Sequence, residues 1–162
     1  MNLNSRNHLE KHIDIRRIEA ILGTNIFSQD QCHNPLVESA FIEIMIRLRD
    51  LVHKTNEEIN FNDDIITGVF NGIKVRTISD CIKYIRDATC HINSKKNNYK
   101  DNDSMSCFNR VYGRGAEPSG LLSSDYSDDV CFFYGQQKIY LKRHIIRFFE
   151  ESKKYLKNLD AK

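Results

Sequence analysis

Apolar residues recur every three or four positions in four stretches of the chain, which is the spacing of an α-helix with one buried face. The longest stripe lies within residues 35–54 and consists of Val37, Phe41, Ile44, Met45, Leu48, Leu51 and Val52. Shorter stripes predict helices over residues 6–22, 77–93 and 142–159. The pattern therefore predicts a chain whose core is built mainly from helices.

The stretch of residues 55–76 interrupts this spacing with Asn, Asp and Gly, although it keeps several Ile, Val and Phe residues. One interpretation is a short helix over residues 63–70 that ends in a turn. The other is a small β-hairpin around Asn71-Gly72, a dipeptide that favours tight turns. We slightly prefer the short helix, followed by a turn that leads into the helix predicted over residues 77–93.

Further along, polar residues 94–106 predict a loop or a disordered segment, and residues 108–112 are compatible with a short strand. Residues 130–134 and 138–141 are rich in aromatic and β-branched side chains and flank Gly-Gln-Gln, which predicts a β-hairpin. A two-stranded ribbon is marginal in water by itself. The hairpin must therefore pack on the helices or pair with residues 108–112.

These elements together predict a mainly α fold: a small up-and-down bundle of four to five helices with a short β-hairpin before the last helix. A chain of 162 residues fits a single domain over residues 1–162. Its 40% hydrophobic and 28% charged residues argue against global disorder and a fibrous class. No apolar run approaches the ~20 residues that span a bilayer, so no membrane association is expected.

Five scattered cysteines without a CxxC pair, and an N-terminal stretch without the pattern of a secretory signal, indicate reduced thiols and a cytoplasmic location. The chain has no HExxH, no phosphate-binding glycine loop, no clustered His and Cys with zinc spacing, and no Gly-framed serine elbow. We therefore expect no metal and no cofactor.

The helix predicted over residues 77–93 has an unusual polar side. Its apolar stripe consists of Ile78, Cys81, Ile82, Ile85, Thr89 and Ile92. At ~100° per residue, Arg86, Asp87, Cys90 and His91 share one arc of roughly 140° away from that stripe. Arg86 and His91 are about 7.5 Å apart along the helix axis. A permanent cation and a titratable imidazole thus look out of the same side of one helix.

This pair suits cleavage of a phosphodiester. Histidine can give or take a proton near neutral pH, and arginine can hold phosphate oxygens through two parallel hydrogen bonds. RNA supplies its own nucleophile in the 2′-hydroxyl, so no metal is required. His91 would move the proton, and Arg86 would stabilise the charge that develops on the phosphate oxygens. The alternative is that both side chains are merely solvated on an exposed helix face.

The sequence Arg86-Asp87-Ala88-Thr89-Cys90-His91 resembles the motif of the HEPN superfamily, in which an Arg is followed by four to six residues and a His, often with Asn, Asp or His directly after the Arg. The resemblance implies a helical bundle, usually a homodimer with the two motif helices facing each other. It also implies a metal-independent endoribonuclease in the dimer cleft, of the kind found in toxin–antitoxin and phage-defence systems. Arg86 and His91 would be the catalytic pair, and Asp87 their polar helper.

The formal net charge of +2 is too small to identify a nucleic-acid-binding protein, but its distribution is uneven. Between Lys138 and Lys162 there are eight Lys or Arg against three Asp or Glu. Such a segment attracts phosphate backbones. We predict RNA contacts from four basic residues near the hairpin and the final helix: Arg110, Arg114, Lys142 and Arg143.

Two other functions remain open. The chain can be a non-catalytic helical module that binds RNA or a protein, or a helical interaction or immunity protein without any role with nucleic acid. Besides RNA and a second copy of the chain, a cognate antitoxin is an expected partner of the ribonuclease.

Overall fold

The computed structural model of this chain describes residues 3–90, 108–116, 122–135 and 137–160. It divides into two compact units, Met1–Ile59 with Phe149–Lys162, and Asn60–Phe148. The expectation of one domain over residues 1–162 stays a prediction.

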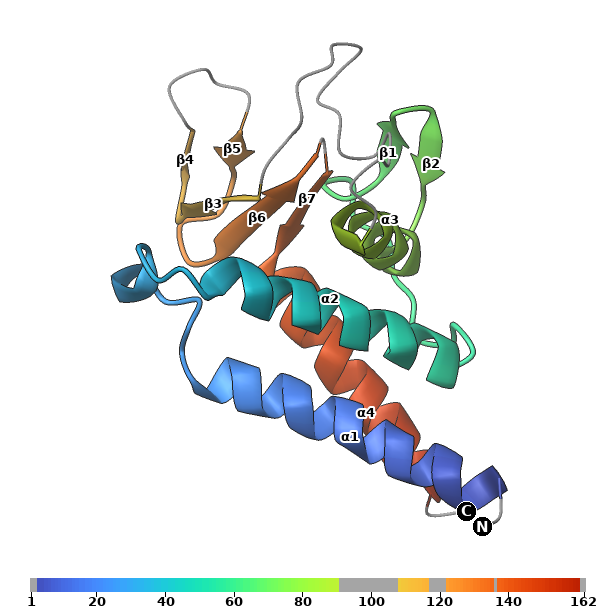
Figure 1. Ribbon diagram of the computed structural model, residues 1–162. Helices are drawn as coiled ribbons and strands as arrows, with labels where there is room; N and C mark the ends of the chain where they lie inside the picture. Colours follow the sequence, from blue (N-terminus) through green and yellow to red (C-terminus); the bar gives the residue numbers. More distant parts are fainter. Residues whose placement is uncertain (1–2, 91–107, 117–121, 136, 161–162) are drawn as a thin grey trace. The chain divides into compact units, whose positions relative to one another are not determined.

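The first unit is helical (Figure 1). α1 (Leu3–Gly23) and α2 (Val37–Lys54) pack against each other, and a short 3-10 turn, η1 (Gln29–Gln31), lies in their connection. α4 (Arg147–Asp160) belongs to this unit from Phe149 onward. Lys153 of α4 forms an ion pair with Glu19 of α1 at 2.6 Å.

The apolar stripe predicted for α2 is confirmed, because all seven of its members are buried: Val37, Phe41, Ile44, Met45, Leu48, Leu51 and Val52. Polar side chains link α2 to α1. Asp14 of α1, which is only 2% exposed, accepts a hydrogen bond from Arg47 at 3.0 Å and forms a second ion pair with Lys54. A buried carboxylate with two cationic partners thus fixes how the two helices pair.

The second unit contains an antiparallel sheet of order β3-β6-β7, made of β3 (Asn109–Tyr112), β6 (Val130–Tyr134) and β7 (Gln137–Tyr140). The predicted hairpin is therefore confirmed as β6 and β7, and it pairs with the predicted strand at residues 108–112. Two short strands, β4 (Gly115–Ala116) and β5 (Ser123–Ser124), form a further pair that the sequence did not predict.

Register assigns side chains to the two faces of this sheet, because residues directly opposite each other point to the same side. Cys131 lies opposite Tyr140 and belongs to a buried cluster with Phe133, against which Tyr126 and Val111 pack. Phe132 and Ile139 are opposite each other on the other face, and both are fully buried. Both faces of the sheet therefore contribute to the interior.

The stretch of residues 55–76 contains a β-hairpin instead of the helix that we preferred. β1 (Gly68–Phe70) pairs with β2 (Ile73–Val75), and Asn71 and Gly72 both have positive φ angles, 49° and 75°. A two-residue turn with both φ values positive matches the twist of the two strands. The amide of Asn71 donates to the hydroxyl of Tyr84 at 3.1 Å, which ties the turn to the following helix.

The prediction of a mainly α bundle with a single hairpin is therefore wrong. The described residues form four α-helices and seven strands in three small antiparallel sheets, a mixed α and β fold. The sequence of a short apolar run between Gly and Asn residues does not show which other segment it pairs with as a strand. Strands of two or three residues carry too few positions to display an alternating pattern.

Candidate functional site

The predicted catalytic motif begins on α3 (Ile78–Cys90), whose first turn is capped. The N–H of Asp80 donates to the Thr77 hydroxyl at 3.3 Å, and the Asp80 carboxylate accepts from the N–H of Arg76 at 2.9 Å. These bonds satisfy N–H groups that have no partner within the helix. One side of α3 is buried through Ile78, Ser79, Cys81, Ile82, Tyr84, Ile85 and Ala88.

Arg86 and Asp87 lie between that buried side and solvent. Their side chains are 38% and 24% exposed, and the guanidinium contacts the carboxylate at 3.3 Å. Cys90, at the end of α3, is exposed. His91 and Ile92, which the sequence assigned to the polar arc and to the apolar stripe, lie outside the described residues. The pairing of Arg86 with His91 therefore stays a prediction.

Of the residues predicted to hold RNA, Arg110 is on the α3 side of the sheet. It lies opposite Phe132, and Phe132 lies opposite Ile139, so these three share a face. Gln137, two residues before Ile139, donates from that face to the sulfur of Cys81 on α3 at 3.4 Å. α3, which carries Arg86, therefore packs on the sheet face to which Arg110 belongs, where it contacts β6 and β7.

The other predicted RNA ligands surround a short acidic loop, residues 125–129. Arg114 donates to the carbonyl oxygen of Asp125 at 3.1 Å, and Lys142 donates to the carbonyl oxygen of Asp128. Arg143 forms ion pairs with Asp128 at 2.8 Å and with Asp129 at 3.1 Å. Part of the basic charge counted in the sequence is thus offset by carboxylates of the same chain.

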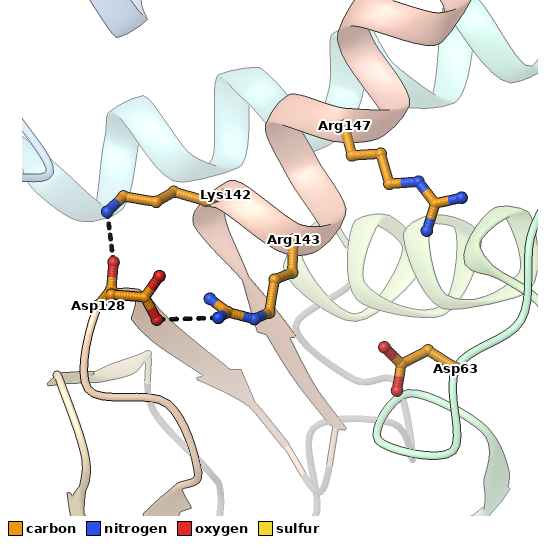
Figure 2. A pocket seen from close by; sticks show the side chains of 5 residues that line it. All are labelled: Asp63, Asp128, Lys142, Arg143 and Arg147. Carbon is orange, nitrogen blue, oxygen red and sulfur yellow. Dashed lines mark hydrogen bonds and ion pairs between the residues drawn. The ribbon is translucent and has the colours of Figure 1, made fainter.

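Lys142 and Arg143 also line an open pocket of about 420 Å³ together with Arg147, Asp63 and Asp128. Figure 2 shows the three basic side chains projecting from one helical segment, with Asp128 and Asp63 facing them from separate loops. Aromatic rings hold both guanidinium groups. Arg143 lies 3.7 Å from the centre of the Tyr126 ring, and Arg147 lies 3.9 Å from that of Phe61.

Lys142 and Arg143 belong to η3 (Leu141–Ile146), which is π-helical and runs directly into α4, where Arg147 is the first residue. The Asp129 carboxylate accepts hydrogen bonds from the first turn of η3. One carboxylate oxygen accepts from the N–H groups of Val130 and Lys142 at 2.8 and 2.9 Å, and the other accepts from the N–H and the guanidinium of Arg143, both at 3.1 Å. Because the Asp129 side chain is fully buried, these bonds are shielded from water.

His144 is fully buried and contacts Asp63, one of the residues that line the pocket. Its Nδ1 lies 3.0 Å from the backbone nitrogen of Tyr140 and must accept that N–H, so Nε2 carries the proton and donates to Asp63 at 3.2 Å. Burial lowers the pKa of His144, and the nearby Asp63 carboxylate offsets this only in part. Burial by itself would raise the pKa of Asp63, but the N–H of Ile65 and His144 outweigh it and lower that pKa. His144 therefore positions Asp63 and does not face a ligand.

The structure thus separates the predicted site residues into two groups. Arg86, Asp87 and Arg110 belong to the α3 side of the sheet, whereas Arg114, Lys142 and Arg143 surround the acidic loop. The pocket residues Asp63, Asp128 and Arg147 were not predicted. No local signal in the sequence connects Asp63 to Arg147, because they are 84 positions apart along the chain.

Among the described residues, no three His, Cys, Asp or Glu side chains are grouped so that they can hold a metal ion. None of the helices in that part of the chain combines the length and the apolar character needed to cross a membrane. The absence of metal and cofactor from the reaction stays a prediction.

Comparison with known proteins adds no relative: no protein-family model, curated protein or solved structure matches this chain.

Proposed function

We propose that this chain is a metal-independent endoribonuclease of the HEPN type, which cleaves RNA with Arg86 and His91 and uses Asp87 to orient Arg86. The observation that carries the proposal is the position of Arg86. It lies near the end of an amphipathic helix, with its guanidinium partly exposed and held against the neighbouring carboxylate. An arginine that is anchored yet reachable can bind a phosphate without first leaving the protein interior.

In this mechanism, His91 takes the proton from the 2′-hydroxyl as that oxygen attacks the phosphorus. The bond to the 5′-oxygen of the next nucleotide breaks, that oxygen takes up a proton from water, and the products are a 2′,3′-cyclic phosphate and a 5′-hydroxyl end. Arg86 stabilises the negative charge on the non-bridging oxygens. A homodimer would bring two such pairs to one cleft. We place the activity in the cytoplasm, as a toxin or phage-defence effector that a cognate antitoxin can restrain.

The proposal is tested by incubating the purified full-length chain with single-stranded RNA in excess EDTA and resolving the products on a gel. We expect His91→Ala to reduce the cleavage rate by ~10²–10⁴-fold and Arg86→Ala by ~10²–10³-fold. Lys83→Ala is the matched control, because Lys83 is an exposed cation on the same helix. It should cleave like the unmodified protein.

The melting temperature of each variant shows whether folding is kept, and the partial exposure of Arg86 predicts a small change. If the unmodified protein cleaves no RNA with or without divalent metal, or if the two variants cleave as well as the Lys83 control, the ribonuclease proposal is wrong.

A second candidate is a non-catalytic module that binds RNA, and the pocket with Lys142, Arg143 and Arg147 is the observation that favours it. Salt-dependent RNA binding without any cleavage would distinguish this function from the ribonuclease.

A further inference from the structure

Three cations at the start of the final helical segment line one pocket: Lys142 and Arg143 of η3, and Arg147, the first residue of α4. The N–H of Arg147 donates to the carbonyl oxygen of Lys142, five residues earlier, so the two residues lie one turn apart. In a regular α-helix, residues five apart are separated by ~140° around the axis. The irregular turn therefore places Lys142 and Arg147 at the same pocket, with Arg143 between them (Figure 2).

The two arginines at this pocket are held in place before any ligand binds. Each guanidinium lies over an aromatic ring, Arg143 over Tyr126 and Arg147 over Phe61. A guanidinium that stacks its face against a ring directs its N–H groups outward at its edge, where carboxylates and anions bind. Less side-chain freedom is then lost when an anion binds.

Two neighbouring aspartates contact Arg143 in different ways. Asp129 is fully buried and also accepts backbone N–H groups of η3, so it is part of the framework. The Asp128 side chain is 63% exposed and makes a hydrogen bond with Arg143 at 2.8 Å. Exposed ion pairs of this kind contribute little to stability, because water competes for both partners. An external anion can therefore replace Asp128 but not Asp129.

From this arrangement we propose that Lys142, Arg143 and Arg147 bind a backbone phosphate of single-stranded RNA, and that Asp128 is an internal competitor at this site. The three cations that line this pocket suit the charge of a phosphodiester. Its negative charge is spread over two non-bridging oxygens, and further phosphates flank it along the strand. Asp63, held by His144 and the N–H of Ile65, borders the pocket and limits how far the strand extends on that side.

This inference depends on the proposed function only for the choice of RNA as the polymer. Its test measures binding, by the fluorescence anisotropy of an end-labelled single-stranded oligouridylate. The full-length protein carries His91→Ala so that cleavage does not consume the probe. Asp128→Asn and the double variant Lys142→Gln/Arg147→Gln are compared with Lys74→Gln, which removes an exposed cation of β2 outside the pocket.

We expect the double variant to raise the Kd about tenfold at moderate salt. Because each phosphate contact on a single strand contributes about 0.7 to the slope of log K against log salt, that slope should fall by roughly 1.4. Asp128→Asn should lower the Kd about threefold, and Lys74→Gln should change neither quantity by as much. A general loss of folding cannot explain both results, because the double variant raises the Kd whereas Asp128→Asn lowers it.

The inference is overturned if the double variant binds RNA like the Lys74 control, or if Asp128→Asn weakens binding. It is also overturned if a polyglutamate peptide, but not RNA, binds in a way that requires Lys142 and Arg147, because the site then recognises an acidic protein segment. RNA binding that follows the expected pattern in a protein that never cleaves RNA would refute the ribonuclease and leave this site standing. Cleavage that requires Arg86 but is insensitive to the pocket variants would support the ribonuclease and refute the phosphate site.

Discussion

Replacement of Asp129 by alanine should destabilise the second unit at one defined place, the start of η3. The buried carboxylate accepts two N–H groups of the first helical turn, from Lys142 and Arg143, and that of Val130. Loss of a helix cap costs ~0.5–2 kcal/mol, and a buried donor that is left without a partner costs ~1–3 kcal/mol. We therefore expect Asp129→Ala to lower the free energy of unfolding by about 2–4 kcal/mol.

Urea denaturation followed by circular dichroism measures this change as a shift in the midpoint at constant slope. In thermal melts, the same loss corresponds to ~5–15 °C for a chain of this size. Asp128→Ala is the matched control, because it removes the same side chain one position earlier, where it is 63% exposed. It should leave the midpoint almost unchanged. Equal effects of the two substitutions would refute the distinction between a structural and a displaceable aspartate.

The other predictions concern buried polar groups. Since burial lowers the pKa of His144 below 6.5, the unfolded chain binds more protons than the folded chain below that pH. Stability should therefore fall as the pH drops from about 6.5, and His144→Gln should flatten this part of the profile in urea titrations at several pH values. Asp14→Ala should cost ~3 kcal/mol, because it removes the buried carboxylate that pairs with both Arg47 and Lys54 and leaves Arg47 with the Glu43 carboxylate alone. Arg17→Ala, at an exposed ion pair, should change the urea midpoint by no more than ~0.5 kcal/mol, and equal losses for the two would contradict the burial argument. Tyr140→Phe removes a hydroxyl that bonds the N–H and the carboxylate of Asp125, and thermal melts should show a loss of ~1–2 kcal/mol; an unchanged melting temperature would show that these bonds add nothing.

The sequence by itself determined the elements whose pattern is long and local. The stripe of α2 repeats over five turns, so its buried side follows from the 3.6-residue period. The cap of α3 joins residues three and four positions apart, so its bonds at Thr77 and Asp80 are also local in the sequence. Only two residues separate β6 from β7 along the chain, so their pairing was also local.

Only the tertiary structure decided the contacts between distant segments. It chose the hairpin over the helix in residues 55–76, where Asn71 anchors the turn to Tyr84, and it set the acidic loop against Arg114, Lys142 and Arg143. The pocket depends on a π-helical turn, whose i→i+5 bonds break the regular spacing from which helix faces are predicted. The sequence therefore shows how many basic residues the chain has. Folding determined which of them face a carboxylate of the chain and which line a pocket. The physical reason is that electrostatic partners are fixed by distance in space, which sequence separation does not specify.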